Sequence, residues 1–273
     1  MNEKLGVADR AMLRSLLAAS DRAGVTPCLI GAMALTWSLA DAGIQPLVRT
    51  TLDWDFAVAV SSWQAFDELA ERLLQDGAFR RSREPHRFQH AEGAVVDVVP
   101  FGLLEDPPGS LRWPDGSVMS TVGFPALLSN HVVHDLGRGL RVASASLPAL
   151  VGLKILAFGD RRPAEVRDLQ DVHHVARGFP WDPGQGLDRL AEVAVREGVI
   201  AFRDLGAFLL GRAVRGVFDA EACGRMAHVL VDAGDPWSDL VSCIARQQRV
   251  VAEEQDRLPV SDCLVALRAG LTS

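Results

Sequence analysis

The sequence RTTLDWDFAVAV, at residues 49–60, has polar side chains at every second position from 49 to 55, and bulky apolar side chains at 52, 54 and 56. Alternate side chains of a β-strand point to opposite faces, so this stretch would have one polar face, formed by Arg49, Thr51, Asp53 and Asp55. Its remaining bulky side chains are apolar and would face a core. Two carboxylates one pleat repeat apart repel each other unless a cation lies between them, and Mg²⁺ prefers oxygen ligands. The stretch therefore predicts a half-buried strand with a Mg²⁺ site suited to phosphate chemistry.

A glycine precedes this strand at a predicted turn between a strand and a helix. Residues 27–31 (PCLIG) are typical of a short buried strand, and residues 32–43 of a helix that ends at a glycine. Gly31 would lie at the start of that helix, where a missing side chain lets backbone N–H groups approach an anion closely. We therefore expect a phosphate-binding turn at Gly31.

A third acid, Asp97, interrupts the apolar stretch AVVDVVPFG at residues 94–102. An unpaired carboxylate flanked by two valines on each side would be costly to bury. A metal ion shared with Asp53 and Asp55 would remove that cost. The alternative is a solvated strand end for Asp53 and Asp55, with Asp97 paired to an arginine. The agreement between the three acids and the glycine turn favours the metal site.

The order of these features resembles the nucleotidyltransferase superfamily: Gly31-Ala32, a helix, the acidic strand and then a lone strand aspartate. The resemblance implies that Gly31 and Ala32 hold the triphosphate of an NTP. It also implies that Asp53 and Asp55 bind two metal ions, Mg²⁺ or Mn²⁺, and that Asp97 binds the one that activates the attacking hydroxyl. Ala32 stands where many members carry Ser or Gly, a change that leaves the backbone donors in place.

A second stretch, residues 147–172, is similar to a signature of AbiEii/AbiGii-type toxin nucleotidyltransferases, so the resemblance covers roughly residues 25–176. The matching positions are Lys154, Ala157, Arg161, Arg167, Asp168 and Asp171. Lys154 lies in an apolar helix, where a buried ammonium needs a partner, and we expect it to contact the β- or γ-phosphate. The alternative is a lysine that extends to solvent.

Four further residues complete the predicted nucleotide-binding set: Arg49, Thr51, Asp168 and Asp171. Arg49 would position a phosphate or pair with Asp53. Asp168 and Asp171, one helical turn apart, would pair with Arg161 or Arg167 or shape the acceptor site.

The composition of the 273 residues, 48% hydrophobic and 23% charged, is that of a globular protein. No apolar run reaches the ~18 residues that span a bilayer, and the polar N-terminus has no secretory core. The four cysteines lack metal-ligand spacing: Cys28, Cys223, Cys243 and Cys263. We therefore expect a cytoplasmic protein with free thiols and no membrane partner.

The net charge of −7 argues against general nucleic-acid binding, DNA included. A local basic segment can still bind RNA, and residues 79–90 (FRRSREPHRFQH) contain four arginines. An RNA strand could cross this segment with Phe88 or His86 stacked on a base. The alternative is an edge strand kept charged to prevent aggregation.

The overall pattern predicts an α+β fold: a nucleotidyltransferase-like mixed β-sheet with flanking helices, followed by an all-helical C-terminal domain. We place the nucleotidyltransferase core at residues 1–145 and the helical domain, which would complete the active-site cleft, at residues 146–273. Within the core we expect helices at residues 8–23 and 63–75, a single arginine-rich strand near residues 79–90 that forms a hairpin with the Asp97 strand, and a strand at residues 141–145.

The predicted reaction transfers NMP from an NTP to a hydroxyl acceptor and releases pyrophosphate. The toxin-like resemblance implies that the acceptor is the 3′ end of tRNA and that a cognate antitoxin protein exists. One alternative is an antibiotic-type enzyme with a small-molecule acceptor, which the acidic charge mildly favours. A second is a catalytically silent NTP-binding module. Two weaker patterns, His131-x-x-His134 as a zinc site and Gly206-x4-Gly211 as a phosphate loop, lack the partners those sites need.

Overall fold

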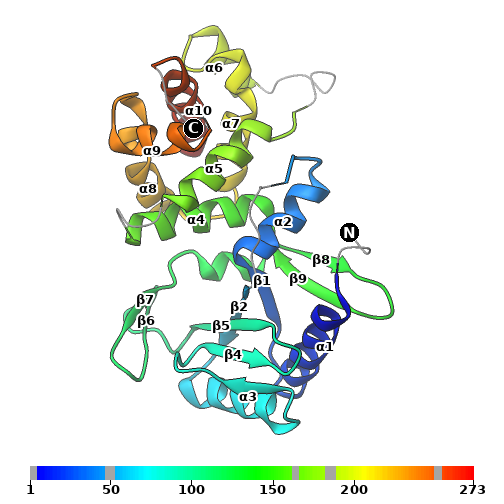
Figure 1. The fold of residues 1–273 in the computed structure, drawn as a ribbon. Helices are drawn as coiled ribbons and strands as arrows, with labels where there is room; N and C mark the ends of the chain where they lie inside the picture. Colours follow the sequence, from blue (N-terminus) through cyan, green and yellow to red (C-terminus); the bar gives the residue numbers. More distant parts are fainter. Residues whose placement is uncertain (1–4, 47–52, 162–165, 182–188, 249–253) are drawn as a thin grey trace. The chain divides into compact units, whose positions relative to one another are not determined.

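The computed structural model describes residues 5–46, 53–161, 166–181, 189–248 and 254–273. The chain forms two compact units. The sheet unit comprises residues 1–40 and 48–150, and the helical unit comprises residues 41–47 and 151–273. Both units are drawn in Figure 1. Arg49 and Thr51 lie outside the described residues, so their predicted roles have no counterpart below.

Within the described part of the sheet unit, seven strands form one mixed sheet in the order β3-β4-β5-β2-β1-β9-β8, and two form a separate hairpin. Strand β2 runs parallel to β5 and antiparallel to β1, which in turn runs parallel to β9. The bounds of the strands are β1 Pro27–Ile30, β2 Asp53–Val60, β3 Phe79–Arg81, β4 Arg87–His90, β5 Val95–Gly102, β6 Ser110–Arg112, β7 Val118–Ser120, β8 His131–Asp135 and β9 Arg141–Ala145. The predicted mixed sheet is confirmed.

The apolar face of β2 forms the centre of the core in the sheet unit. Trp54 and Phe56 are 2% and 0% exposed, and Val58 is fully buried. Trp37 of helix α2 (Gly31–Asp41) packs edge-on against Trp54, with ring centroids 5.8 Å apart. The predicted alternation along β2 is therefore confirmed, and it leaves Asp53 and Asp55 on the opposite face.

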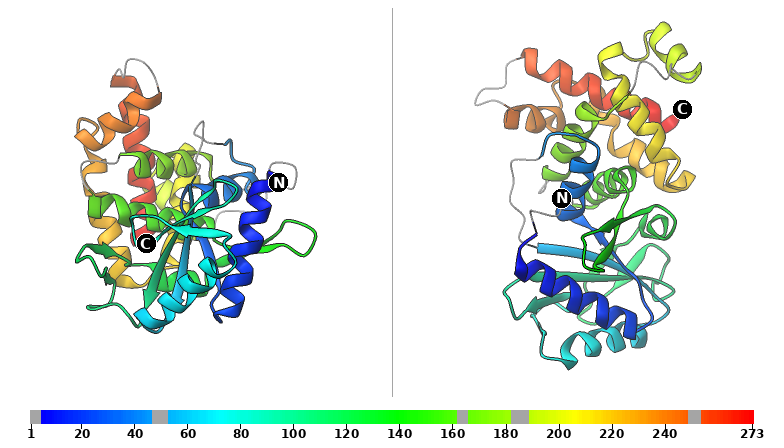
Figure 2. Two further views of the ribbon diagram at one scale, coloured as in Figure 1. Left: turned by 60° about the horizontal axis from the view of Figure 1, so that its bottom comes forward. Right: turned by 90° about the vertical axis from the view of Figure 1, so that its right-hand side faces the viewer.

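Two helices of the sheet unit, α1 (Val7–Arg22) and α3 (Trp63–Gln75), pack against each other, as the views in Figures 1 and 2 show. Ser62 is the N-cap of α3, and its hydroxyl accepts a hydrogen bond from the backbone N–H of Ala65 at 3.2 Å. This cap satisfies a donor that the first helical turn leaves without a partner. The predicted bounds of this helix are confirmed.

The described part of the helical unit contains only helices and their connections. Their bounds are α4 Leu147–Arg161, whose first turn belongs to the sheet unit, α5 Arg167–Gly178, α6 Arg189–Arg196, α7 Leu205–Arg215, α8 Ala220–Val229, α9 Asp239–Gln248 and α10 Glu254–Thr272. Short 3₁₀ turns are η3 Phe202–Asp204 and η4 Val231–Gly234 here, and η1 Phe124–Leu128 in the sheet unit. The predicted helical C-terminal region is confirmed.

Helices α7 and α10 pack backbone to backbone. A Cβ at Gly211 would overlap the carbonyl oxygen of Leu267, and one at Gly270 would overlap that of Phe208. Gly211 therefore serves helix packing and not phosphate binding, as the missing lysine and hydroxyl indicated. Close contact of this kind needs a residue without a side chain.

The arginine-rich segment at residues 79–90 differs from the prediction. It forms two short antiparallel strands, β3 and β4, and not one continuous strand. The backbone N–H of Ser82 donates to the carbonyl of Arg87 at 2.9 Å and closes a turn that contains Pro85. A proline cannot donate to a strand ladder, which explains the break. Strands β6, β7 and β8 were not predicted, because few of their residues are buried and no apolar pattern marks them.

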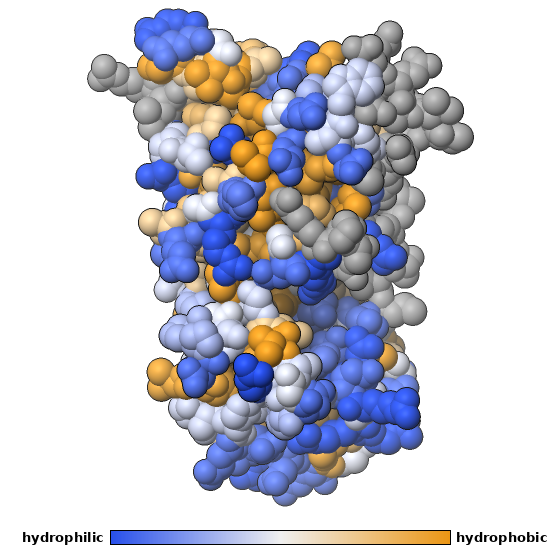
Figure 3. All heavy atoms as spheres, turned by 90° about the vertical axis from the view of Figure 1, so that its left-hand side faces the viewer, coloured by the Kyte–Doolittle hydropathy of each residue, from blue (hydrophilic) through white to orange (hydrophobic). Residues whose placement is uncertain are grey.

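No helix in the described ranges combines the length and the apolar character needed to cross a bilayer. The helical unit does expose several large apolar side chains, on separate segments: Val199, Phe202, Val231, Trp237 and Leu258. Figure 3 shows hydrophobic areas interspersed with hydrophilic ones on one face of this unit. Scattered exposure of this kind is ordinary for a folded protein.

Candidate functional site

The three predicted carboxylates lie on two neighbouring strands of the sheet. In the parallel register of β2 and β5, Asp55 is the direct partner of Asp97, and Asp53 is the partner of Val95. The side chain of Asp53 is 47% exposed and that of Asp97 is 12% exposed. Asp55 thus has the accessible Asp53 carboxylate two residues away on its own strand, and the buried Asp97 carboxylate opposite it on β5.

Arg87 of β4 is the partner of Asp97. Its Nε donates to Oδ1 and its Nη2 donates to Oδ2 of Asp97, both at 2.8 Å. The same Nη2 lies 3.7 Å from Oδ2 of Asp53. The hydrogen bonds with Asp97 raise the pKa of Arg87 above its ordinary value, although partial burial acts in the opposite direction. A bidentate ion pair of this kind is among the strongest interactions between a guanidinium and a carboxylate.

The pair between Arg87 and Asp97 changes the reason for expecting a metal. Burial of Asp97 does not by itself require one, because Arg87 compensates the buried charge. The sequence contains a signal for this pair in the glycine at residue 93, which is typical of a hairpin turn. A hairpin centred on residue 92 places residue 87 opposite residue 97.

Gly31 lies directly against the Asp55 carboxylate. It is the first residue of α2 and has a φ of +72°, in the left-handed region that favours glycine. A Cβ at this position would overlap an oxygen of Asp55 and lie 2.8 Å from its Cγ. Ala32 follows in the first turn of α2, and its carbonyl accepts a hydrogen bond from Thr36 Oγ1 at 2.9 Å. The structure therefore brings the predicted glycine turn and the predicted acidic strand together.

The predicted phosphate ligand Lys154 lies in the helical unit and has two carboxylate partners. Its Nζ is 2.9 Å from Asp168 Oδ1 and 2.8 Å from Asp171 Oδ2. All three side chains are largely buried, at 13%, 15% and 5% exposed. The sequence predicts that the two acids pair with Arg161 or Arg167 or shape the acceptor site, and it does not predict their pairing with Lys154. Lys154 does not extend to solvent.

The other residues that the sequence suggested for RNA or zinc binding do not lie together. Phe88, predicted to stack on a base, is 0% exposed and belongs to the core, so this prediction was wrong. His86 remains accessible in part and lines a pocket. His131 and His134 lie on β8, where His131 is exposed and His134 buried. Residues three apart on a strand face opposite sides, which explains why they do not converge.

Three cysteines are free thiols in the described part of the chain: Cys28, Cys223 and Cys263. Burial raises the pKa of Cys28 and of Cys263 to about 12. A thiol with such a pKa is neutral at pH 7 and a poor nucleophile or metal ligand. This agrees with the expectation of free structural thiols for these three residues.

The donor chemistry around β2 fits Mg²⁺ in type, because three aspartates at adjacent register positions supply hard oxygen ligands. Three carboxylates and the Arg87 guanidinium together carry two net negative charges, which still favours a divalent cation. Within the described residues, however, no group of three or more His, Cys, Asp or Glu side chains is arranged to hold a metal ion. Binding by all three aspartates would require Arg87 to release Asp97.

No family model matches this chain, and no curated protein matches it. Among solved structures, it is similar to an antigenic nucleotidyltransferase-like protein from Paracoccidioides brasiliensis, at 18% identity over 78% of this chain and 96% of that one, with a TM-score of 0.42. It is also similar to JHP933 from Helicobacter pylori, at 12% identity over 97% and 94% of the two chains and a TM-score of 0.41. The antibiotic-resistance factor ANT(2″)-Ia matches at 15% identity over 61% and 82%, with a TM-score of 0.38.

Proposed function

We propose that this protein is a nucleotidyltransferase that transfers NMP from an NTP to a hydroxyl acceptor. One observation carries the proposal: the left-handed Gly31 at the start of α2 lies against Asp55, and Asp55 is in register with Asp97. An anion-binding helix start beside carboxylates suits a triphosphate whose charge is balanced by metal ions. No other cluster in the described residues combines these two elements.

The chain's own residues would divide the work as follows. The first backbone N–H groups of α2, from Gly31 and Ala32 onward, would donate to phosphate oxygens, because the first turn of a helix leaves these donors without helical partners. Asp53, which is half exposed, and Asp55 would hold Mg²⁺ or Mn²⁺, together with Asp97 once Arg87 releases it. The bound metal would neutralise charge at the α-phosphate while the acceptor oxygen attacks and pyrophosphate leaves.

We propose a role for Lys154 in phosphate binding only on the condition that it gives up a carboxylate partner. The ammonium and the two carboxylates of Asp168 and Asp171 carry one net negative charge, which does not attract a phosphate. Lys154 would contact the NTP only if it left at least one of these partners. Otherwise it serves to anchor α5 on α4.

For the acceptor we propose the 3′ end of tRNA, with a toxin-like role in which a cognate antitoxin protein would control the enzyme. The support comes from the sequence signature in residues 147–172 and from the exposed arginines Arg80 and Arg83 in the segment that includes β3 and β4. Exposed arginines of this segment could position an RNA backbone. An antibiotic-type small-molecule acceptor remains the alternative, and the test separates the two.

The test is to incubate the purified protein with Mg²⁺ and each α-labelled NTP in turn, in parallel with total tRNA and with an aminoglycoside, and to measure NTP binding separately. The Asp53→Ala/Asp55→Ala protein removes the proposed metal ligands, and Asp76→Ala removes an exposed carboxylate elsewhere in the sheet unit as a matched control. We expect label on tRNA with the wild type and with Asp76→Ala, and none with the double variant.

Absence of label on tRNA, with label transferred to an aminoglycoside instead, would contradict the RNA acceptor and support the alternative. Absence of both NTP binding and transfer would refute the enzymatic proposal as a whole. Equal labelling by the double variant would show that these carboxylates are not the catalytic ones.

A further inference from the structure

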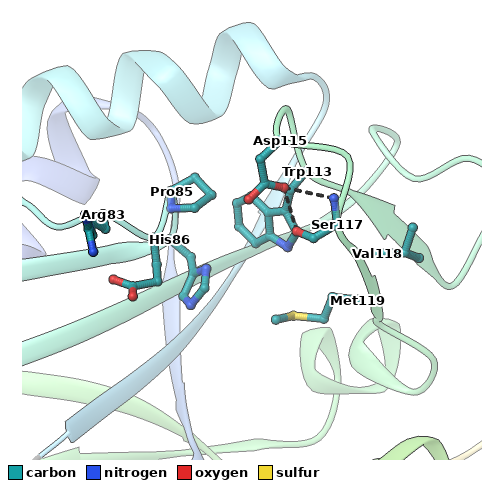
Figure 4. A pocket seen from close by; sticks show the side chains of 9 residues that line it. Arg83, Pro85, His86, Trp113, Asp115, Ser117, Val118 and Met119 are labelled. Atoms are coloured by element: carbon teal, nitrogen blue, oxygen red, sulfur yellow. Dashed lines mark hydrogen bonds between the residues drawn. The ribbon is translucent and has the colours of Figure 1, made fainter.

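A pocket of about 460 Å³ lies within the sheet unit, between the start of β4 and the β6–β7 hairpin. Its walls include His86, Pro85 and Arg83 on one side and Trp113 and Met119 on the other (Figure 4). His86 immediately precedes Arg87, the residue that holds Asp97. The pocket is therefore next to the carboxylate site in the sequence, and its Trp113 wall packs on α3.

The hairpin side of the pocket is rigid. The backbone N–H of Trp113 donates to the carbonyl of Ser117 at 2.8 Å, and the Asp115 carboxylate accepts from the N–H and the hydroxyl of Ser117 at 2.9 and 2.6 Å. The Trp113 ring makes a tilted contact with Trp63 and an edge contact with Phe66 of α3, at centroid distances of 5.5 and 6.1 Å, and a tilted contact with His86 at 5.2 Å. A preformed wall of this kind costs little ordering entropy when a ligand binds.

Two buried polar atoms at the pocket have no hydrogen-bond partner among the described residues: Nε1 of Trp113 and Nδ1 of His86. Trp113 is only 3% exposed, so water does not freely solvate its N–H. Figure 4 shows its indole nitrogen on the edge of the ring that faces the space between His86 and Met119. An unpaired buried donor costs about 1–3 kcal/mol, so such atoms mark a place where a bound group supplies the partner.

The chemistry of the walls selects among possible ligands. Indole N–H is a donor only, so the ligand must supply an acceptor atom at this point. The imidazole, the proline ring and the thioether of Met119 form flat or adaptable apolar surfaces that suit a planar ring. A nucleobase is planar and carries acceptors and donors along one edge, and the volume is in the range of small-ligand pockets.

We propose that this pocket binds a nucleobase, with a base acceptor atom on the Trp113 N–H and a second edge atom on His86 Nδ1. The inference rests on the proposed function, since a nucleotidyltransferase offers two sources of nucleobase: the NTP and an RNA acceptor. It assigns a binding residue, Trp113, whose indole nitrogen the carboxylate site does not use.

The test follows the six tryptophan indole N–H signals by NMR in the unmodified protein, with Trp113→Phe used to assign the signal of Trp113. The ligands are the four ribonucleosides, the four NTPs without Mg²⁺, short single-stranded RNA, and ribose 5-phosphate as a control without a base. We expect a saturable downfield shift of the Trp113 N–H with at least one base-containing ligand. A shift with mononucleotides assigns the base of the NTP, and a shift with RNA alone assigns the acceptor.

Trp113→Phe keeps the aromatic packing and removes the N–H donor. We expect it to bind the base-containing ligand about fivefold more weakly, because it loses one neutral hydrogen bond. Trp237→Phe is the matched control, because Trp237 is exposed in the helical unit and does not line the pocket, and the affinity of this variant should stay within twofold of wild type. No shift with any base at millimolar concentration, or an equal shift with ribose 5-phosphate, would overturn the proposal. Unchanged affinity in Trp113→Phe would do the same.

The two proposals fail separately. Nucleobase binding is measured without Mg²⁺ and should persist in the Asp53→Ala/Asp55→Ala protein. Nucleobase binding without any NMP transfer would therefore count against the proposed function alone. NMP transfer without a base-dependent shift would count against the pocket alone.

Discussion

At the scale of single residues, Gly31 is a position where a missing side chain shapes the candidate site. We predict that Gly31→Ala reduces NMP transfer by about 100-fold in kcat/KM, because the new Cβ must displace the Asp55 carboxylate. The left-handed φ of +72° adds roughly 1–2 kcal/mol of strain. The measurement is steady-state transfer kinetics together with the free energy of unfolding.

Gly77→Ala is the matched control for this prediction. Gly77 has a φ of +67° but would place its Cβ where no atom lies within 4 Å. It should lose similar stability and keep its activity. If both variants lose activity equally, backbone strain and not the displacement of Asp55 is responsible.

Arg87 is the second residue whose replacement is informative, because it acts where a cation is proposed to bind. We predict that Arg87→Met destabilises the protein in EDTA by about 1–3 kcal/mol, since it leaves the buried Asp97 charge without its partner. Mg²⁺ should restore more stability in Arg87→Met than it adds to wild type, because no guanidinium competes for Asp97. Thermal unfolding with and without Mg²⁺ measures both effects.

The control for the Mg²⁺ effect is Asp53→Ala/Asp55→Ala, which should show no dependence of the melting temperature on Mg²⁺. An equal Mg²⁺ response in wild type and Arg87→Met would show that Arg87 and the cation do not compete. In that case the pair of Arg87 and Asp97 is structural, the alternative that the sequence left open.

At the scale of elements, the contact between α7 and α10 depends on two glycines. We predict that Gly211→Ala and Gly270→Ala each destabilise the protein by about 1–3 kcal/mol, because the added methyl meets backbone atoms that no side-chain rotation can move. Gly224→Ala in α8 is the control, since no atom lies within 4 Å of its Cβ. It should be neutral or stabilising by about 0.5–1 kcal/mol from helix propensity.

Urea unfolding measures these three variants in parallel. Destabilisation by Gly224→Ala as large as that of Gly211→Ala would remove the distinction between packing and propensity. Unchanged stability in both Gly211→Ala and Gly270→Ala would show that the two helices can separate without cost.

At the scale of the whole molecule, acid sensitivity should depend on one buried histidine. Burial lowers the pKa of His173 from 6.5 to about 4. Between these values the unfolded chain binds a proton that the folded chain does not, so stability is present above pH 6.5 and is lost as the pH falls toward 4. We predict that His173→Gln loses less stability between pH 7 and pH 5 than wild type, by about 1–2 kcal/mol.

Two comparisons make this prediction decisive. The exposed His228, in the same unit, should behave as wild type when changed to Gln. Burial also raises the pKa of Asp204, which works in the opposite direction, so stability should be compared between variants at each pH. An unchanged pH dependence in His173→Gln would assign the acid sensitivity to other groups.

Much of the architecture follows from local patterns in the sequence. The alternation in residues 53–60 predicts β2 because burial of Trp54 and Phe56 fixes which side faces the core. The serine before Trp63 and the Asp76-Gly77 pair predict α3, since caps act within one helical turn. Strands β6 to β8 were not predicted because most of their residues are not buried, so their sequences lack the apolar pattern of a core strand.

The sequence by itself determined the residue types and local positions of the site: Gly31 at a strand-to-helix turn, Asp53 and Asp55 on one face of a strand, and Asp97 in an apolar one. Only the tertiary structure decided which side chains pair: Arg87 with Asp97, and Lys154 with Asp168 and Asp171. It also decided that the buried Trp113 N–H has no hydrogen-bond partner among the described residues. Side-chain alternation and helix capping are local and can be read along the chain. Ion pairs and pockets depend on strand register and helix packing, which join residues far apart in sequence, and therefore on the folded structure.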